Sequence, residues 1–85
     1  MDQSLTMALR DAGLRWPDTR RGGPSLDDLL QAIPRTAKGF LLRCKGANAW
    51  NARWWYDICL EADGATPREA TARLWLALHR RGYAR

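Results

Sequence analysis

Residues 53–61 alternate two sets of side chains, and this alternation restricts the fold more than any other feature of the sequence. A period of two residues is typical of a strand in a sheet with one buried face. The first set, which we expect to be buried, is Trp54, Tyr56, Ile58 and Leu60. The second set, which we expect on the opposite face, is Arg53, Trp55, Asp57, Cys59 and Glu61.

A second strand is predicted over residues 38–45, which Gly39 and Gly46 bound. Residues 46–49 are too short for a parallel crossover, so the strands should be antiparallel. Residues 50–54 could add a short strand of their own, and the sequence leaves two or three strands open. One face of residues 38–45 would carry Phe40, Leu42 and Cys44, and the other Leu41, Arg43 and Lys45.

Helices are predicted on both sides of these strands. Thr66 begins the clearest one, because Pro67 occupies the first helical position and Glu69 completes a capping box. This helix should run to about Arg81 and end at Gly82. Two shorter helices are predicted before the strands, one over residues 4–12 and one that starts at the N-cap Ser25 and stops at Pro34.

This order of elements predicts an α+β fold: short N-terminal helices, a two- or three-stranded antiparallel sheet, and a long C-terminal helix packed on one face. We expect residues 1–85 to form a single domain. Residues 18–24 contain two Gly, one Pro and the adjacent pair Arg20 and Arg21. A flexible loop is predicted there, and an Arg-bearing contact loop is the alternative.

The chain is basic, with 14 Lys and Arg against 9 Asp and Glu and a net charge of +5. All but two of these cations are arginines, whose planar donors suit carboxylates and phosphates. Such a balance fits nucleic acid or an acidic protein surface as a partner, and it fits plain solubility equally well.

No arrangement typical of catalysis or cofactor binding occurs, so we expect no enzyme, no cofactor and no metal site. His79 is the only histidine, and near a helix end it would complement the helix dipole. Cys44 and Cys59 form no CxxC pair and are predicted to be free thiols. Asp57, Glu61 and Asp63 are interpreted as solvent-facing groups of a hairpin. The alternative is that these three carboxylates cluster and bind a metal ion.

No stretch of about 18 apolar residues is present. The first residues also lack a basic segment followed by an apolar run. We therefore expect a cytoplasmic protein that has no membrane partner.

The candidate binding residues lie on the predicted polar face of the sheet. Trp55 shares this face with Arg53, and Arg43 and Lys45 would lie on the neighbouring strand. Such a face could anchor a protein through Trp55, with the cations as a rim. It could also stack bases and neutralise phosphates, or Trp55 could pack against an N-terminal helix or a second copy in a homodimer. A protein complex is slightly favoured.

Two segments resemble small bacteriophage and prophage proteins. The first is Ala62-Asp63-Gly64-Ala65-Thr66-Pro67-Arg68-Glu69-Ala70 followed by Leu74-Trp75-Leu76-Ala77-Leu78, and the second is residues 23–34. The same strand-to-helix junction is found in HicB-type antitoxins. The resemblance implies a mobile-element α/β sandwich protein in a bacterial host cell. Some proteins of this kind bind host defence or regulatory machinery, anti-CRISPR proteins among them.

The sequence therefore predicts a non-catalytic accessory protein that binds a host or phage complex, with inhibition of host defence as one version. The alternatives are a nucleic-acid-binding module and a HicB-like antitoxin. The candidate partner-binding residues are Trp55, Arg53, Arg43, Lys45, Arg20 and Arg21.

Overall fold

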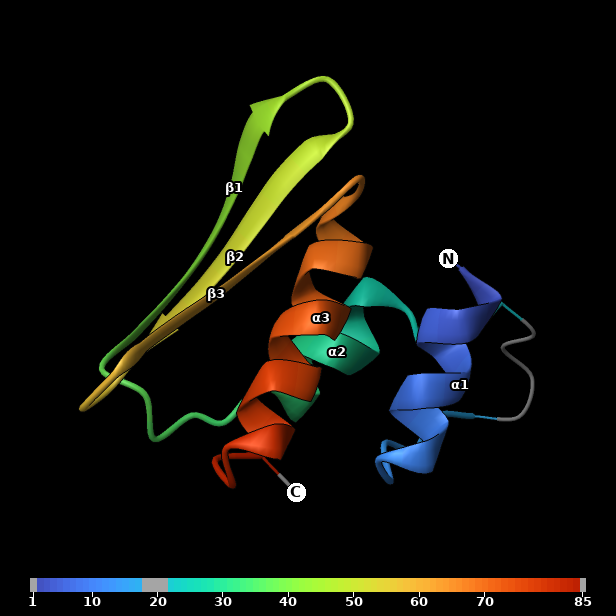
Figure 1. The fold of residues 1–85 in the computed structure, drawn as a ribbon, viewed down its shortest axis with the longest axis horizontal. Helices are drawn as coiled ribbons and strands as arrows, with labels where there is room; N and C mark the ends of the chain where they lie inside the picture. The colour runs from blue at the N-terminus through green and yellow to red at the C-terminus, as the bar shows by residue number, and fades with distance from the viewer. Residues whose placement is uncertain (1, 18–21, 85) are drawn as a thin grey trace.

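A three-stranded antiparallel sheet and three helices make up the computed structural model, which describes residues 2–17 and 22–84 (Figure 1). The strands follow one another in the order β1-β2-β3. The α+β prediction is confirmed, and the sheet has three strands rather than two. The elements in chain order are α1 (Gln3–Asp11), α2 (Leu26–Ala32), β1 (Gly39–Gly46), β2 (Ala49–Trp55), β3 (Cys59–Gly64) and α3 (Pro67–Arg80).

The continuous strand predicted over residues 53–61 is wrong, because a tight turn at residues 56–58 divides it. The Tyr56 amide donates to the Ile58 carbonyl at 2.9 Å, and the chain reverses there. Trp55 then lies opposite Cys59, and Arg53 opposite Glu61. Residues that face each other across a ladder share a face, so Arg53, Trp55, Cys59 and Glu61 stay together. Asp57 of the same predicted set lies in the turn, and Tyr56, which was expected to be buried, is 49% exposed there.

Helix α3 covers one face of the sheet and builds the core. It packs mainly on β3 and β2 and touches β1 least. In Figure 1, α3 stands between the sheet and α1, and α1 packs on α3. None of the described helices therefore lies on the other face of the sheet. Fully buried side chains in this core include Trp54, Trp75, Leu74, Leu78, Leu9 and Leu29.

The helix ends use their predicted N-caps with one difference. The Thr66 hydroxyl accepts from the Glu69 amide at 3.1 Å, but the Glu69 carboxylate accepts from the Ala65 amide rather than from Thr66. The complete capping box is at α2. There, the Ser25 hydroxyl accepts from the Asp28 amide and the Asp28 carboxylate accepts from the Ser25 amide.

The end of the predicted 18–24 loop is fixed to the start of α3. Arg68 donates through Nε to the Pro24 carbonyl at 2.6 Å and through Nη2 to the Gly22 carbonyl. Gly23 and Pro24 are buried. The remainder of the loop, residues 18–21, lies outside the described residues.

Gly64, where β3 meets α3, is predicted to tolerate no side chain. A Cβ at this position would overlap the backbone of Glu69 and Ala70. We expect Gly64→Ala to lower the free energy of unfolding by about 1–3 kcal/mol, as overpacking does in well-packed cores. Denaturant unfolding followed by circular dichroism measures this loss.

Gly46→Ala is the matched control for this prediction. A Cβ at Gly46 meets nothing within 4 Å, so its effect should stay within about 0.5 kcal/mol. Equal stability of the two variants would show that β3 and α3 are not in close contact in solution.

Candidate functional site

The sheet face opposite α3 carries most of the residues that the sequence marks as candidate binding residues. We call it the open face and define it by the side chains that the strand register places there. Trp55 and Arg53 lie on it from β2, and Arg43 lies on it from β1, as the alternation predicts. Lys45 falls at the register irregularity between Cys44 and Gly46, and its contact with Asp63 places it on the same face. The rest of the open face is Gly39, Leu41, Asn51, Cys59, Glu61 and Asp63.

Trp55 lies across β1 at a position where β1 has no side chain. Its register partner is Gly39, and a Cβ there would overlap the six-membered ring of the indole. Trp55 is half-buried in this position, although none of the described helices covers it. The alternative that Trp55 packs against an N-terminal helix is therefore wrong. Close by, Leu41 is 42% exposed, which adds apolar surface beside the indole.

Acidic side chains of β3 pair with two of the predicted cations. Arg53 donates through Nε to Glu61 Oε2 at 3.0 Å, and its Nη2 lies at the same distance from that oxygen. The Lys45 ammonium lies 3.6 Å from Asp63 Oδ1. The positive charge that the sequence predicts for this face is thus partly neutralised within the sheet.

Asn51 is a residue of the open face that the sequence analysis missed. It is only 1% exposed, and its Nδ2 donates to Asp63 Oδ1 at 2.9 Å. Its position between the two outer strands follows from the register, which the sequence does not reveal. Asn51 thereby holds the carboxylate that Lys45 approaches.

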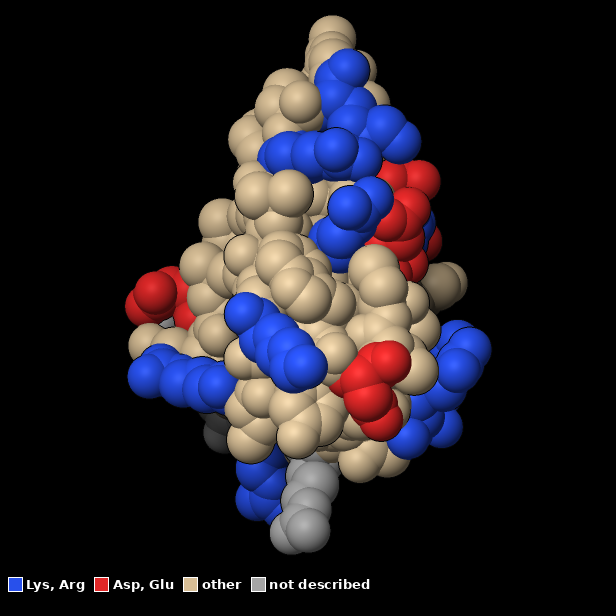
Figure 2. Space-filling view, turned by 90° about the vertical axis from the view of Figure 1, so that its left-hand side faces the viewer, with Lys and Arg blue, Asp and Glu red and all other residues tan. Residues whose placement is uncertain are grey.

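Figure 2 views the molecule from the left-hand side of Figure 1, the side of the sheet away from α3. Lys and Arg side chains gather toward the narrow upper end, where the β1–β2 hairpin lies in Figure 1, and acidic side chains lie directly beside them. Below this end, uncharged side chains lie between further separate Lys, Arg, Asp and Glu side chains. The surface is therefore mixed in charge rather than uniformly basic.

The pKa of the Asp63 carboxyl tests whether Asn51 and Lys45 contact this side chain in solution. The hydrogen bond from Asn51, and next the Lys45 ammonium, hold that pKa below its ordinary value of 3.8. Because the folded-state pKa lies below the unfolded one, the stabilisation is present above about pH 3.8 and is lost as the pH falls through the folded-state value. We expect Asn51→Ala to raise the pKa of Asp63 toward 3.8 in an NMR titration of the carboxyl carbon.

Lys45→Gln should raise the same pKa by less than Asn51→Ala does, because the ammonium is the second cause of the shift. A pKa of Asp63 that neither substitution changes would mean that these contacts are not formed in solution.

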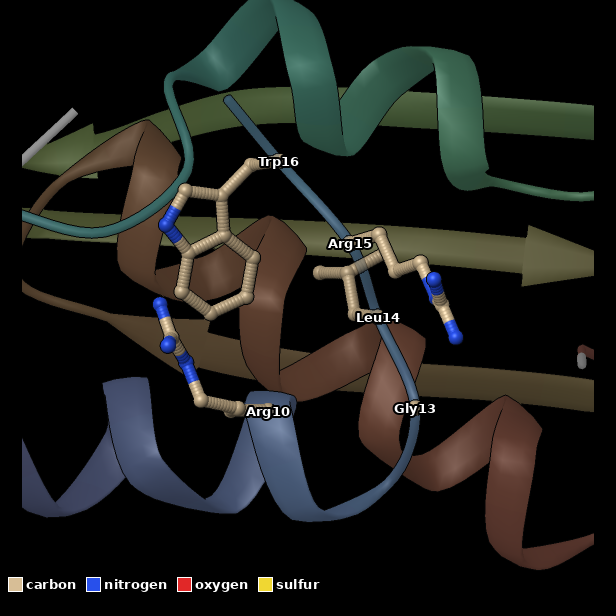
Figure 3. Close-up of a pocket in the computed structure, with 5 residues that line it drawn as sticks. All are labelled: Arg10, Gly13, Leu14, Arg15 and Trp16. Atoms are coloured by element: carbon tan, nitrogen blue, oxygen red, sulfur yellow. The ribbon is translucent and has the colours of Figure 1, made fainter. Parts of the chain in front are cut away.

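A second polar surface lies away from the open face, at the end of α1. The Arg10 guanidinium lies 4.8 Å from the centre of the Trp16 ring. Figure 3 shows Arg10 reaching toward the indole, whereas Arg15 points away from both. The pocket of about 400 Å³ at this point is lined by Arg10, Gly13, Leu14, Arg15 and Trp16. Arg20 and Arg21, the remaining predicted binding residues, lie outside the described residues.

Side chains with catalytic potential are engaged in packing. The His79 ring stacks on Trp75 with centroids 5.2 Å apart, and its Nδ1 lies 3.2 Å from the Ala84 carbonyl. The Tyr83 hydroxyl donates to Asp57 at 2.8 Å, which ties the C-terminal tail to the β2–β3 turn.

Within residues 2–17 and 22–84, no three His, Cys, Asp or Glu side chains are grouped so that they could hold a metal ion. None of the helices in these ranges has the length and apolar character needed to span a bilayer. Cys44 and Cys59 are free, as predicted, and both are exposed. Comparisons of the chain with protein-family models, with curated proteins and with solved structures find no match.

Proposed function

We propose that this chain is a non-catalytic domain that binds a protein of a larger complex through the open face. The observation that carries the proposal is the position of Trp55. Its indole lies on Gly39, half-buried, on a face that none of the described helices covers. A partner would find this ring already in place, so little side-chain freedom is lost on binding.

The surroundings of Trp55 suit a protein partner. Tryptophan and arginine are the residues most enriched at the centre of protein interfaces. Leu41 and Cys59 are exposed on the same face and extend the apolar area around the ring. The ion pair of Arg53 with Glu61 lies next to this area and supplies the polar rim of a typical interface.

The charge pattern argues against a nucleic acid lying along the whole open face. Its phosphates would meet the carboxylates of Glu61 and Asp63, which neutralise Arg53 and Lys45. The hairpin end is the part that favours the nucleic-acid alternative. There Lys45 and Arg73 line the same pocket, and the Arg73 Nη1 donates to the Asp63 carbonyl at 3.0 Å.

The resemblance to small phage and prophage proteins gives this proposal its specific form. An accessory protein of this kind acts in the cytoplasm of a bacterial host, and inhibition of a host defence complex, in the manner of anti-CRISPR proteins, is one version of it. A HicB-like antitoxin is the alternative that rests on the same strand-to-helix junction. Both forms act by binding and not by catalysis. The first test therefore asks whether the open face is the surface that binds the partner.

Photochemical cross-linking from the open face tests the proposal. Leu41 is replaced by a residue with a benzophenone side chain. The variant is expressed in its own host cell, and the cells are irradiated. We expect one protein to be cross-linked from this position. The same group in place of Met7, which is exposed on α1, is the matched control and should not capture that protein.

Two results would contradict the proposal. Cross-linking from position 41 mainly to DNA or RNA would favour the nucleic-acid alternative. Equal capture of the same protein from positions 41 and 7 would show that the open face is not the binding surface.

A further inference from the structure

The outer edge of β1 pairs with no strand among the described residues. In the order β1-β2-β3, β1 bonds to β2 on one side only. Alternate residues of an antiparallel strand direct their backbone groups to opposite sides. Half of the amides and carbonyls of Gly39–Gly46 therefore point outward, where a further strand could bond to them.

An apolar groove lies beside this edge on the helix side of the sheet. It has a volume of about 220 Å³, and Leu30 of α2, which lines it, is 37% exposed. Phe40 lines the groove from β1, and Leu42 follows on the same side of the strand, half-buried because α3 touches β1 least. The other lining residues are Ile33, Pro34, Arg35, Ala37 and Gly39.

The charge along this edge has a single sign. Residues 29–56 contain five Lys or Arg and no Asp or Glu. Lys45 and Arg53 pair with acidic groups of β3, but Arg35, Lys38 and Arg43 form no ion pair with any described residue. The Lys38 ammonium lies 6.0 Å from the centre of the Tyr56 ring. The β1 edge is therefore basic, while β3 at the opposite edge carries the acids.

From these three observations we propose that β1 accepts an extended acidic segment of the partner protein as a fourth strand of the sheet. Side chains of an added strand alternate between the two faces. One set would contact the groove with Leu30, Phe40 and Leu42, and the other would lie beside Arg43 and Lys45. The segment should therefore alternate apolar and acidic residues. This inference rests on the proposed function and names the partner chemistry that the open face recognises.

A second copy of the chain fits the same edge poorly. Pairing β1 with its own copy would bring together two strands that carry Arg43 and Lys45 and no acid. Cations on an edge strand are a common means of preventing such self-association. The positive charge of β1 repels a second copy of the same strand and attracts a strand that carries acidic residues.

Trp55 would take part in this recognition. Because Gly39 has no side chain, the indole extends from β2 across the start of β1. A strand added at the β1 edge would then contact the ring through its residue opposite Gly39. The strand site and the open face are continuous at this point.

A synthetic peptide tests the inference on the full chain. The probe is a fluorescein-labelled octapeptide in which valine alternates with glutamate, and binding is measured by fluorescence polarisation. A control of the same composition, with four valines followed by four glutamates, should bind at least tenfold more weakly. Binding of both peptides with equal affinity would reduce the effect to net charge and overturn the inference.

Methylation of the peptide amides tests the strand geometry itself. In an added strand only alternate residues bond to β1, and all residues of one side-chain set share this role. N-methylation of the valines alone or of the glutamates alone should therefore abolish binding in one case and leave it nearly unchanged in the other. Two methylated peptides that bind equally well, or equally poorly, would overturn strand addition.

Variants of the protein locate the site. Arg43→Glu should weaken binding of the alternating peptide about tenfold, because an attraction becomes a repulsion. Arg80→Glu, an equal change of charge at an exposed position of α3, should leave the affinity unchanged. Equal losses in both variants would show that the peptide senses only the net charge.

Two further outcomes separate this inference from the proposed function. Tighter binding of an eight-nucleotide oligothymidylate than of the alternating peptide would overturn both and favour nucleic acid. Specific cross-linking of one protein from position 41, together with an alternating peptide that does not bind, would overturn strand addition and leave the open face as a protein-binding surface.

Discussion

Replacement of Trp54 by alanine is expected to lower the free energy of unfolding by about 3–5 kcal/mol. Trp54 is fully buried on the helix side of β2. Its ring lies 5.1 Å from that of Tyr83, and its Nε1 donates to the Pro34 carbonyl at 3.2 Å. The substitution would leave a large cavity and remove the hydrogen bond that joins β2 to the segment after α2.

This loss approaches the whole stability of a small domain. At about 0.05–0.15 kcal/mol per residue, a chain of 85 residues has roughly 4–13 kcal/mol. We therefore expect the Trp54→Ala protein to be largely unfolded or to melt far below the wild type, as guanidinium unfolding followed by circular dichroism would show. Trp50→Ala, which removes a half-buried indole of the same strand, should cost clearly less.

An unfolding midpoint that Trp54→Ala leaves unchanged would contradict the packing of the core. It would also remove the reason for assigning the two faces of β2, because Trp54 and Trp55 point to opposite sides.

Local sequence signals predicted most of the elements and missed one turn. Thr66, Pro67 and Glu69 together place the start of α3 correctly, because a cap depends only on nearby residues. The turn at residues 56–58 has no Gly or Pro to indicate it. It is held by contacts distant in sequence, including the bond from the Tyr83 hydroxyl to Asp57. Such a contact is invisible to a local pattern.

The candidate site was predictable as a set of residues but not as an arrangement. Alternation alone places Trp55 and Arg53 on one face, because side chains alternate between the two faces of a strand whichever strand it pairs with. The pairing of Arg53 with Glu61 and the position of Trp55 on Gly39 depend on register. Register is fixed by the turns and by the whole core, so the sequence overestimates the free positive charge of the face.

Replacement of Trp55 by alanine is expected to abolish partner binding while the chain stays folded. Interface tryptophans of this kind contribute about 2–4 kcal/mol, which corresponds to a loss of affinity of roughly 30- to 1000-fold. The measurement is a titration with the protein captured from position 41. Because Trp55 lies outside the core, the unfolding midpoint should change far less than in the Trp54→Ala protein.

Gly39→Ala separates the position of the indole from its presence. The added methyl group would occupy the space of the Trp55 ring, so the ring must move while the residue is retained. We expect this variant to lose much of the affinity that Trp55→Ala loses. Trp16→Ala, which removes another half-buried indole away from the open face, should bind the partner as the wild type does.

The combination of these variants decides what Trp55 contributes. If Trp55→Ala unfolds the chain as Trp54→Ala does, the ring belongs to the core and the open face loses its anchor. If Trp55→Ala and Gly39→Ala both fold and both bind normally, the partner uses another surface. Only a folded chain that loses its partner in both variants fits an indole held in advance for binding, because that role requires both the ring and the glycine beneath it.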